Sequence, residues 1–338
     1  MSDPVRTVVI ALTSGGRPDG DAMGAAFEAI FRGESEPALT AAFLTALAMR
    51  GESASDIAAG AAVMRAHVRR VTAPPGAIDT CGTGGLAWIS LNTSTAAAFV
   101  AAGAGAVVAK HGNRSVPPKT GSADVLEALG VNLNPTDEQL VASFAKAGVS
   151  FMFAPAHHAA MKHVAPVRKA LGIRTVFNLL GPLANPAGAR RQLLGVYSDL
   201  WLTPYAKALR TLGSERAWVV HGQDGMDEIS TTGPTLVTEL KDGEIDTFQI
   251  SPEDLGLPLA NPDELRGGRV GENAAALTQV LEGAPGPFAD LVALNAGAAL
   301  LVAGLAADLR DGLSQARLSI ANGKAMAALE NLKMATHG

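Results

Sequence analysis

A glycine-rich segment in the first third of the chain has residue types suited to phosphate binding. The sequence Asp79-Thr80-Cys81-Gly82-Thr83-Gly84-Gly85 ends a predicted strand, and Asn92-Thr93-Ser94-Thr95 opens the predicted helix that follows. Glycines let backbone N–H groups approach an anion, and a helix N-terminus adds unpaired donors and a positive dipole end. These residues favour a phosphate site, although a tight strand-to-helix connection without a ligand would use the same glycines.

Cationic side chains follow the next predicted strand. The sequence Lys110-His111-Gly112-Asn113-Arg114 continues to Lys119, which places three cations within ten residues. Three such groups beside the glycine-rich turn could surround a pyrophosphate. The alternative is a basic surface loop, but the histidine, asparagine and glycine between the charges favour shaped contacts with a ligand.

Histidines and an arginine form a third group. The sequence Ala154-Pro155-Ala156-His157-His158 leads through Met161 and His163 to Arg168. Neighbouring side chains on a helix point about 100° apart, and no cysteine or carboxylate completes a ligand set, which argues against zinc. His158 and Arg168, ten residues apart, can both reach one pocket, where the guanidinium would pair with a carboxylate substrate. The alternative is a helix-end histidine and a surface arginine.

Two adjacent carboxylates lie in a loop after a later strand. Asp227 and Glu228 belong to the sequence His221-Gly222-Gln223-Asp224-Gly225-Met226-Asp227-Glu228-Ile229. Magnesium is usually held by one or two carboxylates together with substrate phosphates. This pair is therefore our metal candidate, and a solvated acidic turn is the alternative.

Together the four segments describe a site for a diphosphate ester, a divalent metal and a small carboxylate. No motif supplies a catalytic nucleophile. Transfer of a sugar from a diphosphate ester needs mainly positioning and charge stabilisation, because cationic character develops at the anomeric carbon as pyrophosphate leaves. We therefore expect no catalytic residue beyond the groups that position the substrates and stabilise charge.

The elements that must position these segments change in character at Pro74-Pro75-Gly76. Before this point, apolar residues recur three and four apart from Asp21 to Val71, which predicts three helices in a small helical domain. After it, short apolar strands alternate with helices, which is typical of an α/β unit. We expect strands at residues 78–81, 106–109, 150–153, 193–197, 217–221 and 236–240, and helices at 94–104, 122–129, 137–147, 204–212, 273–281, 287–305 and 313–332.

Composition narrows the class of protein. The 338 residues carry a net charge of −5, with 48% hydrophobic and 17% charged residues, so there is no overall positive field to hold nucleic acid or an anionic membrane. The longest apolar run, residues 96–109, is shorter than the roughly 20 residues of a membrane span. A single cysteine, Cys81, and an N-terminus unlike a signal peptide favour a cytoplasmic location.

Five stretches, in this order along the chain, resemble the anthranilate phosphoribosyltransferases. They are DTCGTGG, NTSTAAAFV, KHGNRSV with GSADVLEALGV, FMFAPAHHAAMKHVAPVRKALGIRTVFNLLGPLANPAG, and VVHGQDGMDEIS. The resemblance runs from about Asp21 nearly to the C-terminus, and five stretches in one order are specific. It implies transfer of the phosphoribosyl group of phosphoribosyl pyrophosphate (PRPP) to the amine of anthranilate in tryptophan biosynthesis, with Mg²⁺ as cofactor.

The resemblance also implies a fold and a set of site residues. The expected fold is a small N-terminal helical domain plus a larger α/β domain with a central, mainly parallel sheet flanked by helices. The small domain would comprise residues 1–72, with about 169–185 returning to it, and the large domain 73–168 and 186–338; the chain would form a homodimer. PRPP would be bound by Gly82, Thr83, Gly84, Gly85, Ser90, Asn92, Ser94, Thr95, Lys110 and Ser122. Anthranilate would be bound by Gly82, Asn113, His158 and Arg168, and the metal by Ser94, Asp227 and Glu228.

The chain departs from the family at two places. Leu86-Ala87-Trp88 stand where the family usually has an aspartate and a glycine, and Pro117-Pro118 stand where it has serines or small residues. The first change removes a carboxylate, and the second removes hydroxyl and N–H donors. We interpret both as marks of a subfamily that binds PRPP somewhat differently, because the cationic, carboxylate and acceptor-side residues are all present.

Two other functions compete with this interpretation. One is a pyrimidine nucleoside phosphorylase-like enzyme of the same fold, against which the Arg168 segment and the DGMDE loop argue. The other is a catalytically silent relative that binds nucleic acid through a local basic cleft, against which the acidic pI of about 5.8 and the 4% aromatic content argue.

Overall fold

The structure, a computed structural model, describes residues 3–84, 90–115 and 120–338. Its N-terminal part consists of the helices α1 (Pro4–Thr13), α2 (Gly20–Phe31), α3 (Pro37–Arg50) and α4 (Ala54–Ala66). The first of these was missed, because the expected helical pattern began at Asp21. Val5, Val8 and Leu12 give α1 a buried face at helical spacing. α4 begins at a capping box in which Ser53 and Asp56 exchange hydrogen bonds.

The central sheet has the strand order β3-β2-β1-β4-β5-β6-β7. The strands are β1 (Ile78–Asp79), β2 (Val108–Gly112), β3 (Val149–Phe153), β4 (Arg191–Gly195), β5 (Arg216–Gly222), β6 (Thr235–Lys241) and β7 (Glu244–Ile250). β1 to β5 are parallel, and β6 and β7 are antiparallel, so the prediction of a mainly parallel sheet is confirmed. β7 was not predicted; it is a largely exposed edge strand with several polar residues, so its apolar signal is weak.

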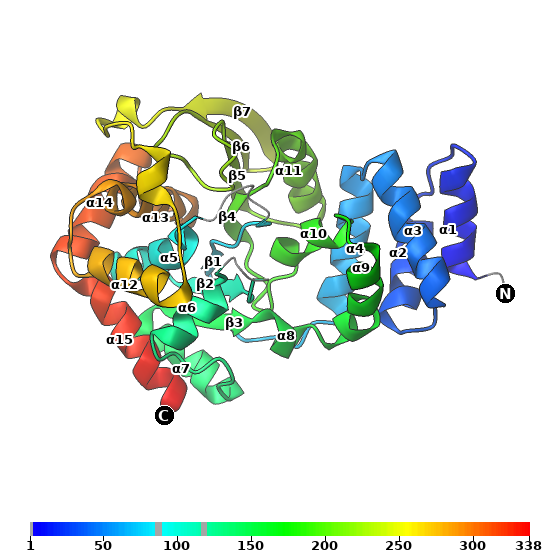
Figure 1. Cartoon of the computed structure of the whole chain (residues 1–338), viewed down its shortest axis with the longest axis horizontal. Coiled ribbons are helices and arrows are strands. Elements are labelled where there is room, and N and C mark those ends of the chain that lie inside the picture. Colours follow the sequence, from blue (N-terminus) through cyan, green and yellow to red (C-terminus); the bar gives the residue numbers. More distant parts are fainter. Residues whose placement is uncertain (1–2, 85–89, 116–119) are drawn as a thin grey trace.

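Helices cover both faces of this sheet (Figure 1). They are α5 (Thr93–Gly103), α6 (Ser122–Ala128), α7 (Asp137–Ala147), α11 (Leu202–Thr211), α12 (Val270–Leu281), α13 (Pro287–Ala303), α14 (Leu309–Ala321) and α15 (Lys324–His337). The single helix expected at 313–332 is wrong: the chain breaks at Gly323, whose φ of +74° ends α14 and starts α15. α13 and α14 approach so closely that a Cβ on Gly312 would lie 2.3 Å from Gly297 O.

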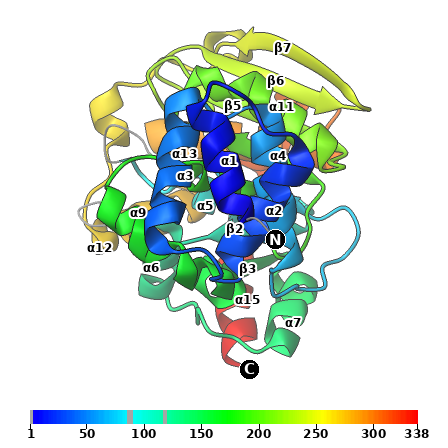
Figure 2. The same cartoon turned by 90° about the vertical axis from the view of Figure 1, so that its right-hand side faces the viewer.

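The segment after β3 crosses back to the N-terminal helices. It comprises α8 (Ala154–His157), the 3₁₀ turn Ala159–His163, α9 (Ala165–Leu171), α10 (Phe177–Leu180) and the 3₁₀ turn Gly181–Leu183. Phe177 packs against Phe27 of α2, with ring centroids 6.1 Å apart, and Val164 and Val167 are buried in the same core. Further 3₁₀ turns occur at Asp199–Trp201, Glu253–Leu255 and Pro262–Leu265. Figure 2 shows α9 beside α3 at the outer end of the molecule.

The strand order places a crevice at one end of the sheet. From β1 the chain moves outward to β2 and β3, and then returns to β4 on the other side of β1. Ligands of open α/β sheets bind at such a switch point, beyond the carboxyl ends of the strands. Among the described residues, none of the helices has both the length and the apolar character needed to cross a bilayer.

Candidate functional site

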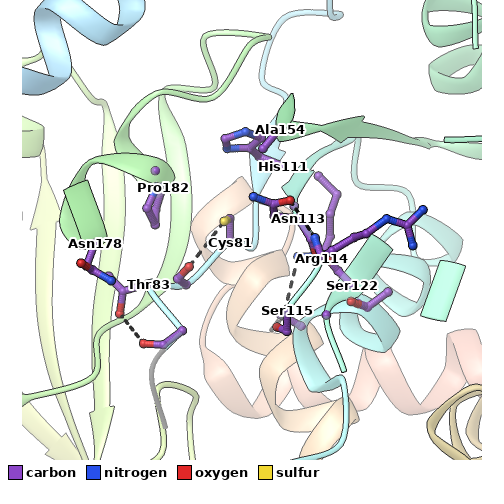
Figure 3. A pocket seen from close by; sticks show the side chains of 18 of the residues that line it. Cys81, Thr83, His111, Asn113, Arg114, Ser115, Ser122, Ala154, Asn178 and Pro182 are labelled. Carbon is purple, nitrogen blue, oxygen red and sulfur yellow. Dashed lines mark hydrogen bonds between the residues drawn. The ribbon is translucent and has the colours of Figure 1, made fainter. Parts of the chain in front are cut away.

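The predicted segments meet beyond the carboxyl ends of the parallel strands, around a cavity of about 920 Å³. Its walls include all of the predicted site residues that the structure describes: Gly82, Thr83, Gly84, Ser90, Asn92, Ser94, Thr95, Lys110, Asn113, Ser122, His158, Arg168, Asp227 and Glu228. Gly85 lies outside the described residues, as do Leu86, Lys119 and the pair Pro117-Pro118. Figure 3 shows side chains around this cavity from the turn after β1, the end of β2 and the segment near α10.

Hydrogen bonds hold the turn after β1 against the end of β4. Thr83 N donates to Gly195 O at 2.9 Å, and Tyr197 N donates to Thr83 Oγ1 at 3.1 Å. The next loop of the site touches the same point, because a Cβ on Gly195 would lie 1.5 Å from the backbone O of Asp227. Only glycine fits at residue 195. Because it has no side chain, the glycine-rich turn after β1 and the loop that carries Asp227 can meet at one end of the cavity.

The first turn of α5 carries hydroxyl and N–H groups into the cavity wall. Ser94 N donates to Glu228 Oε1 at 3.2 Å, and Thr80 Oγ1 donates to Ser94 O at 3.1 Å. Thr95 is buried, and its Oγ1 has no hydrogen-bond partner among the described residues. A half-buried carboxylate thus already accepts from this helix N-terminus, a position that suits an anion.

Lys110 brings a buried positive charge to the same wall. Its side chain is 3% exposed, and Nζ donates to Thr80 O at 3.3 Å and to Ser94 Oγ at 3.4 Å. β2 positions this residue through its parallel pairing with β3, in which Lys110 lies opposite Phe151. The ammonium group therefore lies between the glycine-rich turn and α5, where a phosphate oxygen would meet it.

Hydrogen bonds on both sides hold the acidic loop after β5 in place. Met226 N donates to Asp224 Oδ1 at 3.0 Å, before the carboxylate pair. After the pair, Ile229 N donates to Asn295 Oδ1 at 3.0 Å, and Asn295 Nδ2 donates to Ile229 O at 2.8 Å. Asp227 and Glu228 are therefore presented to the cavity from a backbone that is fixed on both sides.

Burial and the like charge of the neighbouring carboxylate both change the pKa of Glu228 in this pair. Burial raises the pKa of Glu228, and the neighbouring Asp227 raises it further, while Lys110 and the Ser94 N–H group lower it. Two carboxylates that repel each other in a buried place favour a cation between or beside them. Their oxygens and the nearby Ser94 Oγ are hard ligands of the kind that a divalent cation such as Mg²⁺ prefers.

A third buried carboxylate, Asp79, has a structural partner. Asn185 Nδ2 donates to Asp79 Oδ2 at 2.7 Å and to Ala109 O at 2.8 Å, and His111 N donates to Asp79 Oδ1 at 3.2 Å. Burial raises the pKa of Asp79 to about 6, and Lys110 opposes this shift. The carboxyl group and Asn185 hold the short strand β1 against the end of β2.

Asp79, Cys81 and His111 place three potential metal-ligand atoms within 4.8 Å of one another. Burial raises the pKa of the Cys81 thiol to about 12, so the thiol is protonated at neutral pH. Because both oxygens of Asp79 already accept hydrogen bonds, this group is better explained as structural packing at the ends of β1 and β2.

The opposite wall carries two neutral histidines and one arginine. His158 and His111 are buried and hydrogen bonded, with 3.2 Å between their Nε2 atoms. Burial, and then the neighbouring His157, lower the pKa of His158 to about 4, and burial also lowers the pKa of His111. Arg168, on α9, lies 5.9 Å from the centroid of the Phe177 ring, and its guanidinium has no hydrogen-bond or ion-pair partner within the described part of the chain.

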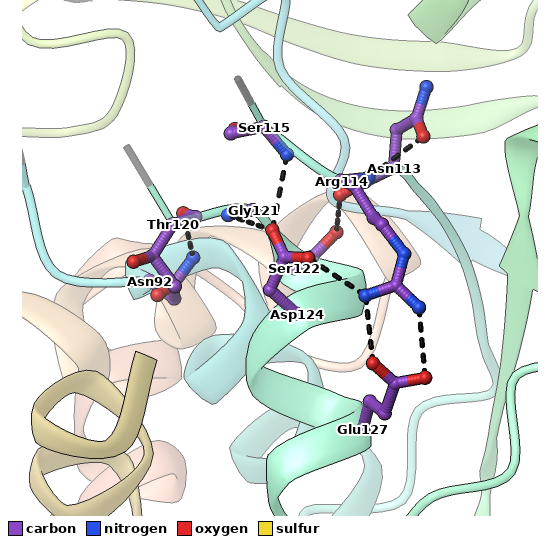
Figure 4. Close-up of polar contacts among 9 residues, drawn as sticks. All are labelled: Asn92, Asn113, Arg114, Ser115, Thr120, Gly121, Ser122, Asp124 and Glu127. Atoms are coloured by element: carbon purple, nitrogen blue, oxygen red, sulfur yellow. Dashed lines mark hydrogen bonds and ion pairs between the residues drawn. The ribbon is translucent and has the colours of Figure 1, made fainter. Parts of the chain in front are cut away.

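The predicted cationic group is only partly brought together. Arg114 lines the cavity, but its guanidinium pairs with Asp124 at 2.9 Å and with Glu127 at 2.8 Å (Figure 4). Asp124 Oδ2 also accepts from Ser115 N at 3.2 Å and from Gly121 N at 2.9 Å. Arg114 therefore joins the end of β2 to α6, and Lys110 remains as the described cation of this group that faces the phosphate-type turn.

Sequence reasoning missed an apolar part of the cavity. Met64 of α4, Phe177, Asn178 and Pro182 also line it, and all come from helical segments outside the four chemical motifs. Their residue types carry no chemical signal by themselves. Only the stretch around Arg168, which includes Phe177, Asn178 and Pro182, pointed to this wall.

Both parts of the chain match a known class of proteins. Residues 74–326 match the family described as glycosyl transferase family, a/b domain, and residues 6–68 match glycosyl transferase family, helical bundle domain. The fold and the site thus define a glycosyltransferase built from a helical bundle and an α/β domain, and the predicted fold class is confirmed.

Particular relatives narrow this class. The anthranilate phosphoribosyltransferase of Parvibaculum lavamentivorans is 52% identical over 333 residues, which cover 98% of each chain. The crystal structure of anthranilate phosphoribosyltransferase from Thermus thermophilus has a TM-score of 0.93 at 42% identity and covers 100% of both chains. That from Saccharomyces cerevisiae in complex with PRPP and Mg has a TM-score of 0.90 at 28% identity, covering 100% of this chain and 99% of the other. The yeast protein in complex with 4-fluoroanthranilate has a TM-score of 0.88 at 27% identity and covers 98% of both. The chain belongs to the anthranilate phosphoribosyltransferase family, as the resemblance predicted.

Proposed function

We propose that the chain transfers the phosphoribosyl group of PRPP to the amine of anthranilate, giving N-(5-phosphoribosyl)anthranilate and pyrophosphate in tryptophan biosynthesis. The observation that supports this most directly is the content of one cavity. A glycine-rich turn suited to phosphate, a pair of adjacent carboxylates and an arginine without a carboxylate partner among the described residues line the same space. The turn matches the pyrophosphate of PRPP, the carboxylate pair matches its metal ion, and the arginine matches the carboxylate of anthranilate.

The donor occupies the α/β side of the cavity. Gly82 and Gly84 would present backbone N–H groups to the pyrophosphate, and Thr83, whose N–H donates to Gly195 O, would hold the turn between them. The first turn of α5 adds Asn92, Ser94 and Thr95. Lys110 places its buried ammonium beside them, where it stabilises the charge that develops on the leaving pyrophosphate. Gly85, Ser90 and Ser122 complete the proposed donor set.

The metal site fits Mg²⁺. Asp227 and Glu228, with Ser94 beside them, would hold the ion, because they offer only oxygen ligands and include one buried and one half-buried carboxylate that otherwise repel each other. When bound, Mg²⁺ neutralises charge on the pyrophosphate and makes it a better leaving group. Asn295 and Asp224 keep the loop that carries the pair in one conformation.

The acceptor occupies the helical side. Arg168 would pair with the carboxylate of anthranilate, and Asn113, His158 and Gly82 would border its ring and amine. The lowered pKa of His158 keeps that imidazole neutral, so it does not compete with Arg168 for the carboxylate. The acceptor amine is itself the nucleophile, so the chain needs to position it rather than to supply a nucleophile.

The organisation of the chain is proposed on the same basis. We propose a small domain of residues 1–72 with about 169–185, a large domain of 73–168 and 186–338, a homodimer, and a cytoplasmic location. Phe177 and Leu180 support the discontinuous domain, since they are buried among the N-terminal helices. Ile10 and Met49, which are 59% and 85% exposed on α1 and α3, support an interface there. A monomeric mass at micromolar concentration in light scattering would exclude the dimer.

The test of function follows anthranilate fluorescence over time with purified protein, PRPP and Mg²⁺, beside a control with EDTA. We expect loss of fluorescence only when PRPP and metal are both present. Persistent fluorescence, together with phosphate-dependent cleavage of uridine or thymidine, would exclude the proposed reaction and indicate a nucleoside phosphorylase.

A further inference from the structure

Four hydrogen bonds form a closed ring behind the donor side of the cavity. Asn92 Nδ2 donates to Thr120 O at 3.0 Å, and Thr120 Oγ1 donates to Gly268 O at 3.1 Å. Gly268 N donates to Asn273 Oδ1 at 2.7 Å, and Asn273 Nδ2 donates to Asn92 Oδ1 at 2.9 Å. We call this ring of hydrogen bonds among Asn92, Thr120, Gly268 and Asn273 the amide ring. It joins the start of α5, the residue before α6 begins its cap at Gly121, and the first turn of α12. Figure 4 shows the bond between Asn92 and Thr120.

The surroundings leave the ring little freedom. Asn273 is 1% exposed and Thr120 is 9% exposed. The backbone before Asn92 is also tied to the segment before α12, because Leu91 N donates to Leu265 O at 3.2 Å. A Cβ on Gly267 would lie 2.2 Å from Ser90 O, so the two backbones are in direct contact there.

The ring changes what the Asn92 side chain does. Asn92 is the N-cap residue of α5, a position where an asparagine oxygen commonly accepts from the first N–H groups of its own helix. Here Asn92 makes no such cap, because Asn273 occupies its oxygen and Thr120 occupies its nitrogen. The N–H groups of the first turn have other acceptors: Ser94 N donates to Glu228 Oε1 at 3.2 Å, and Thr95 N donates to the backbone O of Asn92 at 3.2 Å.

We propose that Asn273, which lies 181 residues after Asn92, is a positioning residue for the phosphoribosyl donor: it fixes the side chain of Asn92, which lines the cavity, and so holds the start of α5 in place at the donor wall. The proposal rests on the proposed function, because the donor site is the same. Asn273 lines no part of the cavity and acts through Asn92.

An amide at residue 273 is required by the ring. The position needs one acceptor for Gly268 N and one donor for Asn92 Oδ1, which an asparagine supplies and an aspartate or an alanine does not. Asn273→Asp keeps the acceptor and removes only the donor. It therefore tests the link to Asn92, whereas Asn273→Ala removes both bonds.

The experiment measures PRPP binding in the presence of Mg²⁺ by calorimetry, and the KM values of both substrates. We expect Asn273→Ala and Asn273→Asp each to weaken PRPP binding and raise the KM for PRPP by about tenfold, the order of one buried hydrogen bond. The KM for anthranilate should change less than about twofold, because its side of the cavity is untouched. In Asn92→Ala, the further change Asn273→Ala should add little, since the two residues act as one unit.

Asn132→Ala is the matched control. Asn132 also joins distant segments, since its Nδ2 donates to Thr336 O at 2.9 Å and its Oδ1 accepts from Asn134 N at 2.9 Å, but it lies outside the cavity wall. We expect a lowered Tm in this variant with unchanged PRPP binding. The proposal is overturned if Asn273→Asp binds PRPP like the wild type, or if Asn273→Ala lowers Tm as the control does without a change in PRPP binding.

The same data separate this proposal from the proposed function. A wild type that binds PRPP but does not consume anthranilate would exclude only the transfer reaction, and the binding comparison among the variants would still decide the role of Asn273. A wild type that does not bind PRPP would exclude both.

Discussion

The donor wall and the acceptor wall of the cavity differ in how far their polar groups are already engaged. On the donor wall, Lys110 and Glu228 are both hydrogen bonded to Ser94, and the amide ring fixes Asn92 behind them. On the acceptor wall, Arg168 has no ion-pair partner in the described ranges, and His158 and His111 are neutral and bonded to each other. The donor wall is thus largely preorganised, whereas the acceptor wall offers the guanidinium of Arg168 to an incoming carboxylate.

The carboxylate pair gives the largest expected effect. Changing Asp227→Asn and Glu228→Gln together removes both charges without changing side-chain size, and we expect turnover to fall by about a thousandfold or more. The measurement is fluorescence-based turnover across a range of Mg²⁺ concentrations. The matched control is Glu253→Gln with Asp254→Asn, an adjacent pair of exposed carboxylates on a 3₁₀ turn. Full activity in the Asp227/Glu228 variant would place the metal elsewhere.

Arg168 provides the corresponding test of the acceptor wall. Arg168→Ala removes the proposed partner of the anthranilate carboxylate, and we expect the KM for anthranilate to rise about a hundredfold, in line with loss of a charge-assisted pair. The KM for PRPP should stay within about twofold. Lys169→Ala, a change at the exposed next residue of α9, is the control and should leave both constants unchanged. Unchanged anthranilate kinetics in Arg168→Ala would contradict the assignment.

The neutral state of His158 can be tested through pH. The pKa of His158 is about 4 in the folded chain, below the ordinary value of 6.5, so the unfolded state binds the proton more tightly. Stability should therefore fall as pH decreases from 6.5 toward 4, and His158 should account for about 2 kcal/mol of the loss between pH 7 and pH 5. Urea unfolding of the wild type and His158→Gln at both pH values measures this. An equal pH dependence in the two proteins would show that His158 is not buried in its neutral form.

The smallest effect is expected at the Arg114 ion pair. Glu127→Ala removes an exposed partner of Arg114, but Asp124 still holds the guanidinium. We expect no measurable change in the urea midpoint or in the KM for PRPP, because exposed ion pairs contribute little. A clear decrease in the KM for PRPP would indicate that the freed Arg114 can turn to the donor, as the sequence had suggested.

Much of the fold was predictable because its signals are local. The helix at Asp137–Ala147 has a capping box at Thr136 and Gln139, and its predicted bounds agree with the structure. The parallel strands are short, buried and apolar, so they stand out between glycine-rich turns. Where the local signal was weak, as in β7, or misleading, as in the helix divided at Gly323, the prediction failed.

The candidate site was predictable in its chemistry but not in its pairings. The sequence alone determined which segments carry phosphate-type, cationic, carboxylate and acceptor chemistry, because residue types and short spacings are visible in it, and their positions after strands predicted a common location. Only the tertiary structure decided that Arg114 pairs with Glu127, that Asn185 holds Asp79, and that Asn273 holds Asn92. Each bond requires a donor and an acceptor within about 3 Å, a precision that is set by the packing of the whole chain rather than by spacing along it.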